Sequence, residues 1–189
     1  MADLTTLANV KEFLSITNAS SDALISSLIT RISVQIENFV ERPILVDDYT
    51  EITDGRENNR GHLMVEQFPI NSIDTLHDDD NRVYDASSLI PAADYVFEAS
   101  YGVVKLTDGA VFDVGIHNVK IVYNAGFADI PGDIEQVAID LVDRKLHNAG
   151  RQNLKSEKLG RWAAAYGAEL PEDVKEVLAR YKKREFDIV

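Results

Sequence analysis

The sequence predicts an α+β protein, in which a helical body carries an inserted lobe of small antiparallel β structure. Two observations predict this class. Apolar residues recur at helical spacing in the first and last thirds, and short β-type runs between turn residues fill the middle. A chain of 189 residues can bury a core without disulfides or metals. We therefore predict one domain with a helical part over residues 1–43, a β insertion lobe over 44–127 and a second helical part over 128–189.

The first part is expected to contain a pair of helices. A short helix is indicated by helical spacing of Leu4, Leu7, Val10 and Leu14. A long helix follows, with Ser20 or Ser21 as its cap and Pro43 marking its end. Its apolar stripe is wide enough to face a core and consists of Leu24, Ile25, Leu28, Ile29, Ile32, Ile36, Phe39 and Val40.

The middle third is expected to form a small antiparallel sheet, because its strands are short and joined by turns. Turn residues occur at Asp54-Gly55, at Asp78–Asn81 and at Asp108-Gly109, the last of which fits a hairpin. The predicted strands are Tyr49–Thr53, Leu63–Val65, Ile73–Leu76, Tyr95–Phe97, Val103–Leu106 and Val119–Tyr123.

The last third is expected to hold two helices that begin in the same way, with "IPGDIEQV" and "LPEDVKEV". Proline suits the first helical position, which predicts that Pro131 and Pro171 each start a helix. Asp140 and Arg144 are spaced to pair on one helix face, and Gly150 is a predicted stop. The stripe that begins at Ile134 is expected to pack on the stripe of the long N-terminal helix.

A structural seam is predicted where the β lobe returns the chain to the helical body. The alternating pattern of a strand ends at Tyr123, Gly126 permits a turn, and Pro131 restarts a helix. We group Tyr123, Gly126, Pro131 and Pro171 as residues of this seam.

The charge is unevenly distributed along the chain, whose net charge is −13. Residues 47–98 contain 13 acidic and 3 basic residues, whereas residues 144–184 contain 11 basic and 5 acidic ones. This pattern favours opposite surfaces with different neighbours, although a solvated acidic lobe would give the same counts. The overall sign argues against a dedicated nucleic-acid binder. Without a cysteine, a basic leader or an apolar run of about 20 residues, the chain is expected to be soluble and made in the cytoplasm.

Two basic segments are candidate contacts with a partner or another subunit. The loop 150–167 holds the only tryptophan, and its candidate residues are Lys155, Lys158, Arg161 and Trp162. The tail from Arg180 to Val189 is basic and then apolar, with candidates Lys182, Lys183, Arg184, Phe186 and Ile188. The alternatives are a surface loop whose tryptophan packs back on the body, and a fraying terminus.

Known catalytic patterns are missing from the sequence. It contains no phosphate-binding glycine loop, no nucleophile elbow and no zinc-binding pair of histidines. The best metal candidate, "HDDDNRVYDASSL", places Arg82, Val83 and Leu89 where a calcium loop needs an oxygen ligand, glycine and glutamate. It is therefore interpreted as an acidic hairpin tip. We predict no catalytic, cofactor or metal site, and we predict that the protein is not an enzyme.

Five segments follow one another along the chain and cover nearly all of it: "LANVKEFLSI", the long helix with "ERPI", "LMVEQFPINSIDTL", "VYNAGFADIPGDIEQVAIDLV" and "SEKLGRWAAAYGAELPEDVKEVLARY". Their order resembles the head–tail connector, or head-completion, family of tailed bacteriophages. Smaller members of that family are nearly all helical, so the β insertion is similar only to the longer branch.

The resemblance implies a structural virion protein of the viral neck, an adaptor that assembles in the host cytoplasm. It implies a ring, typically twelve-fold, that binds beneath the portal after DNA packaging and extends the DNA channel. The implied partners are copies of itself, the portal protein, a stopper or tail-completion protein, and DNA that passes without sequence-specific binding. Because a neutralised phosphate slows sliding, we expect an acidic or neutral bore. The alternatives are another neck or tail-completion component, a cytoplasmic adaptor and a cytoplasmic hydrolase.

Overall fold

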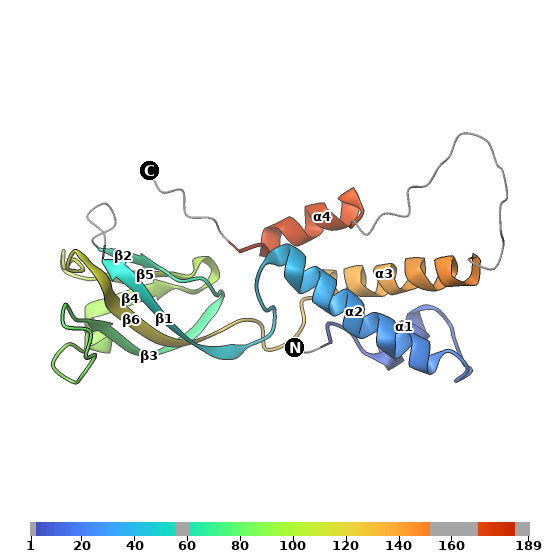
Figure 1. Ribbon diagram of the computed structural model, residues 1–189, viewed down its shortest axis with the longest axis horizontal. Coiled ribbons are helices and arrows are strands. Elements are labelled where there is room, and N and C mark those ends of the chain that lie inside the picture. Colours follow the sequence, from blue (N-terminus) through green and yellow to red (C-terminus); the bar gives the residue numbers. More distant parts are fainter. Residues whose placement is uncertain (1–2, 56–60, 152–169, 184–189) are drawn as a thin grey trace. The chain divides into compact units, whose positions relative to one another are not determined.

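The computed structural model describes residues 3–55, 61–151 and 170–183 (Figure 1). Within these ranges the chain has four α-helices and two three-stranded antiparallel sheets, which confirms the predicted α+β class. The chain divides into two compact units. The helical unit comprises the residues up to Arg42 and those from Asp129 to Lys182, and the β unit comprises Pro43–Ala128 together with Lys183.

The helical unit is built around two long helices that lie side by side (Figure 1). Helix α2 (Asp22–Val40) packs on α3 (Gly132–Arg151), which continues one residue beyond the predicted stop at Gly150. The short helix α1 (Leu7–Phe13) contacts both α2 and α3, and α4 (Glu172–Leu178) also contacts both. Residues from both ends of the sequence therefore form one helical core.

The buried stripe of α2 is narrower than the sequence predicts. Leu24 is 45% exposed and lies outside the core, whereas Leu28 and Phe39 are half-buried. The buried apolar residues follow a spacing of three or four and are Ile25, Ile29, Ile32, Ile36 and Val40. On α3 the buried apolar residues include Ile134, Val137, Ala138, Leu141 and Val142.

The start of α2 has its cap at Ser21, one of the two predicted positions. Ser21 occupies the cap position without a hydrogen bond from its side chain. Asp22 in the first turn instead accepts a bond of 2.6 Å from the Lys11 ammonium of α1. The start of α2 thus has an ion pair to the preceding helix and a backbone bond from Ile25 N–H to Ser21 C=O, without a bond from the serine side chain.

Pro131 and Pro171 were each predicted at the first position of a helix, and both lie one residue before it. Pro131 and Pro171 are the last residues before α3 and α4, and their carbonyls accept bonds of 3.0 Å from Glu135 N–H and Lys175 N–H. Pro171 has the extended conformation of a cap residue, with φ −58° and ψ 151°. The carbonyl of a cap residue accepts a hydrogen bond from an N–H of the first turn while its own backbone stays non-helical, which proline's fixed φ allows.

The predicted pair between Asp140 and Arg144 is wrong. The Arg144 guanidinium donates to Asp173 of α4 at 2.7 Å, and Asp140 accepts from Gln136 at 2.8 Å. Arg144 therefore links two helices instead of bracing one, because a long side chain can reach a carboxylate of a neighbouring element.

The α2–α3 packing predicts a large difference between two leucine substitutions. Leu141 is 5% exposed, so Leu141→Ala should lower the free energy of unfolding by about 2 to 3 kcal/mol through lost burial and a residual cavity. Leu24→Ala is the matched control and should cost less than about 0.5 kcal/mol. Urea titrations of both variants measure this, and equal midpoints would contradict the described core.

The β unit contains two separate sheets rather than the predicted single one. One sheet has the order β1-β6-β3, formed by Asp47–Gly55, Gly115–Ala125 and Ile70–Asp78 (Figure 1). The other has the order β2-β5-β4, formed by His62–Met64, Val103–Leu106 and Tyr95–Glu98. All six predicted strands are present. The buried apolar residues of the β unit form one core, which includes Leu63, Leu76, Tyr95, Val104, Phe112, Val119, Ile121 and Tyr123.

Two of the predicted turns differ from the expectation: one forms no hairpin, and the other lies within a strand. Asp108 and Gly109 have positive φ, and Ala110 N–H donates to Thr107 C=O at 3.0 Å, so a tight turn forms. It connects β5 to β6, which belong to different sheets, and therefore makes no hairpin. Asp54 and Gly55 continue strand β1, where Gly55 pairs with Gly115. Strand pairing over long sequence distance decides both outcomes.

The chain enters and leaves the β unit through two neighbouring segments. Phe127 N–H donates to Ile44 C=O, and Val46 N–H donates to Phe127 C=O, each at 3.0 Å. Gly126, the residue before Phe127, has φ +110°. A Cβ placed on it would lie 2.6 Å from the Leu45 carbonyl oxygen. Only glycine fits this close backbone approach.

Candidate functional site

One end of the β unit gathers its loops. We call it the loop end; it consists of Asp78–Pro91 after β3 and Thr107–Asn118 around the start of β6. It lies opposite the end at which the chain enters β1 and leaves β6, since β1 and β3 run antiparallel to β6.

Asn118 holds the loop end together. It is 1% exposed, and its Oδ1 accepts from Gly55 N–H at 2.7 Å. Its Nδ2 donates to Asp78 Oδ1 and to Asp113 C=O, both at 2.8 Å. Burial raises the pKa of the Asp78 carboxyl, and the bonds from Asp113 N–H and Asn118 partly offset this. One amide thus joins the ends of β1, β3 and β6.

The acidic run in the loop after β3 forms a turn. The Asp79 carboxylate accepts from the backbone N–H groups of Asn81, Val83 and Tyr84 at 2.8, 3.0 and 2.7 Å. These bonds, chiefly the one from Tyr84, lower the pKa of Asp79. Among the described residues, no three His, Cys, Asp or Glu side chains are grouped so that they could hold a metal ion.

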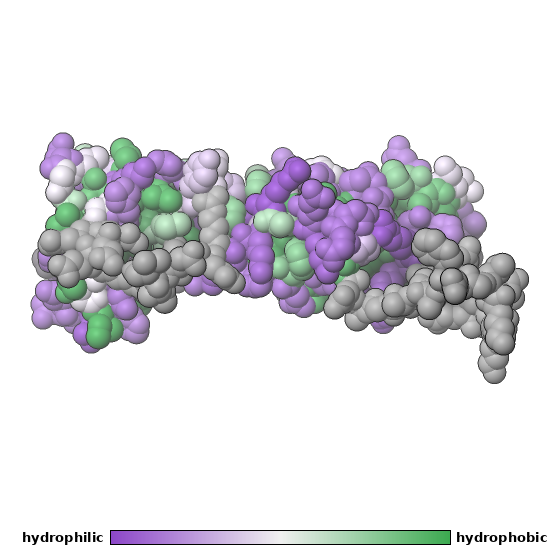
Figure 2. Space-filling view, turned by 90° about the horizontal axis from the view of Figure 1, so that it is seen from above, coloured by the Kyte–Doolittle hydropathy of each residue, from purple (hydrophilic) through white to green (hydrophobic). Residues whose placement is uncertain are grey.

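The loop end exposes several aliphatic side chains. Val114 is 59% exposed and Ile116 is 67% exposed. Phe112 beside them is only 2% exposed and anchors this segment in the core. The other exposed aliphatic side chains of the loop end are Val83, Leu89 and Val111. Apolar patches lie among hydrophilic residues over the β unit (Figure 2). Exposed apolar groups gathered at one end indicate an interaction surface.

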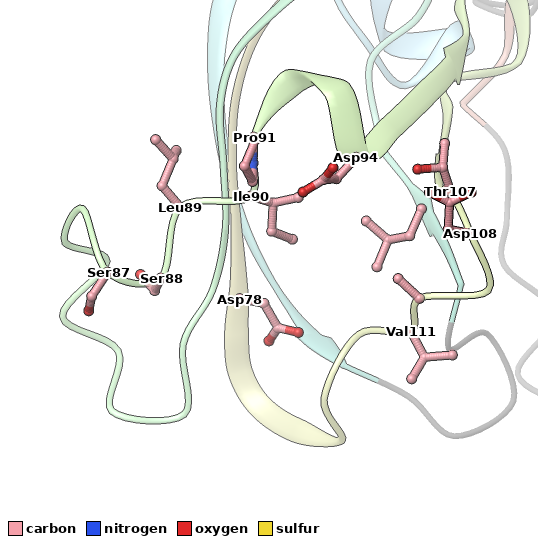
Figure 3. A pocket seen from close by; sticks show the side chains of 12 residues that line it. Asp78, Ser87, Ser88, Leu89, Ile90, Pro91, Asp94, Thr107, Asp108 and Val111 are labelled. Carbon is pink, nitrogen blue, oxygen red and sulfur yellow. The ribbon is translucent and has the colours of Figure 1, made fainter.

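A groove of about 440 Å³ lies between the two halves of the loop end. Asp78, Ile90 and Asp94 point into it, and Thr107–Val111 form the opposite wall (Figure 3). The walls are tied together, because Thr107 N–H donates to Asp94 C=O at 2.9 Å. Apolar residues and carboxylates line it.

A second polar cluster surrounds Glu51 on β1. Its carboxylate accepts from Glu66 N–H at 3.0 Å and from the Tyr123 hydroxyl, which itself accepts from Gln67 N–H at 3.1 Å. Burial raises the pKa of Glu51, against the lowering effect of its hydrogen bonds. Burial and the neighbouring carboxylate also raise the pKa of Tyr123. All these partners are internal, so the cluster stabilises the β unit.

The raised pKa of Glu51 gives a prediction with a definite sign. A carboxyl whose pKa is higher in the folded state adds stability below its unfolded value, near 4.5, and that contribution is lost as the pH rises through the folded value. Glu51→Gln removes this titration. Wild type should therefore lose stability relative to Glu51→Gln between pH 4 and pH 7 in paired urea titrations. A constant difference between the two would contradict the burial of this carboxyl.

The residues predicted as contacts divide into two groups. Lys182 pairs with Glu41 at 3.0 Å, and Lys183 pairs with Glu66 at 2.9 Å, so both lysines are engaged within the chain. The others lie outside the described residues and are Lys155, Lys158, Arg161, Trp162, Arg184, Phe186 and Ile188.

The four residues grouped as a seam are not brought together in one unit. Tyr123 and Gly126 belong to the β unit, where Tyr123 is fully buried. Pro131 and Pro171 belong to the helical unit and precede α3 and α4.

Sequence reasoning missed the loop end. The available signal was "AVFDVGI", an apolar run that lies between two of the predicted strands. The role of Asn118 had no local signal, because its partners lie between 5 and 63 positions away.

No described helix has both the length and the apolar character that crossing a bilayer requires.

Among curated proteins, none matched the chain. Solved structures with a similar fold include a chain of the neck of the native GTA particle, computed with C12 symmetry, at 17% identity and a TM-score of 0.55, covering 95% of this chain and 89% of that one. A chain of the neck of the empty GTA particle, computed with C6 symmetry, has 16% identity and a TM-score of 0.55, covering 95% and 90%. A chain of the virion of the native gene transfer agent has 18% identity and a TM-score of 0.54, covering 95% of this chain and 90% of that one.

The family model described as head completion protein matches residues 3–184. This match spans the helical unit and the β unit, and it agrees with the resemblance carried by the order of the sequence segments. The chain therefore belongs to the head completion protein family.

Proposed function

We propose that this protein is a structural component of the neck that joins the head of a tailed phage, or of a phage-like particle, to its tail. The observation that carries the proposal is the family match over residues 3–184. The similarity of fold to chains from GTA necks, over 95% of this chain, supports it.

In the finer form of the proposal, copies of the chain form a ring beneath the portal protein, and twelve copies are expected. The C12 symmetry of a neck that contains a chain of similar fold supports this number. A ring needs two different surfaces on each copy that meet head to tail. The acidic middle and the basic end of this chain suit such a contact.

The ring is proposed to extend the DNA channel and to offer a docking surface for a stopper or tail-completion protein. A net charge of −13 suits a bore that does not retain DNA, because few phosphates would be neutralised. No enzymatic step is part of the proposal. A cryo-EM map with a bore lined by lysine and arginine would contradict the proposed passage of DNA.

The proposed function is tested by inactivating the gene in the phage or element that encodes the chain. Electron microscopy should then show DNA-filled heads and free tails that remain apart, and expression from a plasmid should restore joined particles. Normal numbers of tailed particles, together with the absence of the chain from purified wild-type particles, would refute the proposal.

The C-terminal segment is proposed to dock on the portal. Deleting Phe186–Val189 should weaken attachment to the portal, because it removes the apolar part of a basic and apolar tail. Co-sedimentation with portal rings measures attachment, and an unchanged melting temperature shows that the fold is intact. Attachment equal to wild type would exclude the tail as a docking element.

A further inference from the structure

The groove at the loop end has the chemistry of a receptor for a basic segment with an apolar anchor. Its floor and walls contain Ile90, Leu106 and Val111, and the carboxylates of Asp78, Asp94 and Asp108 belong to the same lining. Among the described residues that line it, none is a lysine, arginine or histidine. A volume of about 440 Å³ lies within the usual range of ligand-binding pockets.

The groove is already formed in the single chain. Ile90 N–H donates to Leu76 C=O at 2.8 Å, which fixes one wall on strand β3. The turn at Asp108 and the bond from Thr107 N–H to Asp94 C=O fix the other wall. Binding would therefore require little ordering of the receptor, which favours affinity.

We propose that this groove binds the segment Lys155–Trp162 of a second copy of the chain. Its sequence, "KSEKLGRW", places Lys158 and Arg161 beside the only tryptophan. Arginine and tryptophan are the residues most enriched at the energetic centre of protein interfaces. Trp162 would enter the apolar part of the groove, and the two cations would meet Asp94 and Asp108.

Charge complementarity is the reason for choosing a second copy. The groove carries three carboxylates, and the segment belongs to the basic end of the sequence, so copies offer each other matching surfaces. Two different surfaces that meet between identical copies make a head-to-tail contact, which closes into a ring when the rotation permits. The inference thus rests on the proposed ring and names its contact.

A disulfide cross-link tests the contact, because the chain has no cysteine of its own. Val111→Cys places a thiol in the groove, and Ala163→Cys places one beside the tryptophan. A chain with both changes should form disulfide-linked oligomers in purified particles under mild oxidation. The matched control combines Ala163→Cys with Val96→Cys, which is 55% exposed on β4 outside the groove, and should give at least tenfold less cross-linked product.

Charge reversal gives a second readout. In assembled rings the emission of Trp162 should be shifted to shorter wavelength and shielded from acrylamide. Asp94→Lys with Asp108→Lys should remove both effects, and adding Lys158→Asp with Arg161→Asp in the same chain should restore them. Asp74→Lys with Asp80→Lys is the control, since both residues are exposed and lie outside the groove lining.

The outcomes separate the contact from the proposed function. The inference would be overturned if the disulfide formed only within one chain. It would also be overturned if particles that contain the chain showed no disulfide. Neither result would contradict the proposed role in the neck. If particles lack the chain, the proposed function fails. The cross-link in concentrated purified protein then decides the contact alone, since dimers support it and monomers refute it.

Discussion

Asn118→Ala should destabilise the β unit by about 3 to 5 kcal/mol. The substitution leaves the buried N–H of Gly55 without its acceptor and removes the donor that serves Asp78 and Asp113 C=O. Each buried polar group left without a partner costs about 1 to 3 kcal/mol. Urea titration followed by circular dichroism measures the loss.

Two variants separate this network from a general effect of removing an asparagine. Asn124→Ala on the same strand breaks two exposed bonds, to Asp48 at 2.7 Å and from Asn71 at 3.0 Å, and should cost less than about 1 kcal/mol. Asn118→Asp keeps the acceptor for Gly55 but places a second carboxylate beside Asp78. Its folded form should favour protonation, so its stability should fall as the pH rises from 4 to 7. Equal losses for Asn118→Ala and Asn124→Ala would contradict the role of Asn118.

Gly126→Ala should lower the free energy of unfolding by about 3 kcal/mol or more, because backbone strain and a steric clash act together. Its φ of +110° is unfavourable for any residue with a side chain. The new Cβ would lie 2.6 Å from the Leu45 carbonyl oxygen and 2.8 Å from Val46 Cα, and both are backbone atoms that belong to the chain's entry into the β unit. Relief requires separating two paired segments.

Two other glycines are matched controls for this change. Gly109 has φ +74° but nothing within 4 Å of its Cβ position, so Gly109→Ala should show the conformational cost alone, about 1 kcal/mol. Gly132 at the start of α3 has open space and no positive φ, so Gly132→Ala should be neutral or slightly stabilising. Thermal melts should rank the three losses in this order, with Gly126→Ala the largest. An equal effect of Gly109→Ala and Gly126→Ala would show that the backbone contact is unimportant.

The sequence by itself determined the α+β class, the long helices and all six strands, because periodicity and turn residues act over a few positions. The order of its segments also predicted the family, and the match over residues 3–184 shows that family. In α2, the spacing of Ile25, Ile29, Ile32, Ile36 and Val40 was sufficient to predict a buried face.

Only the tertiary structure decided how these elements combine. The middle divides into two sheets because β6 pairs with β1 and β3, which are distant in sequence, and the turn at Asp108 therefore joins different sheets. Arg144 binds Asp173 rather than Asp140 because helix packing brings α4 within reach. The loop end, its groove and the bonds of Asn118 arise in the same way. Their partners meet only through long-range pairing and burial, whose energies depend on neighbours that no local pattern contains.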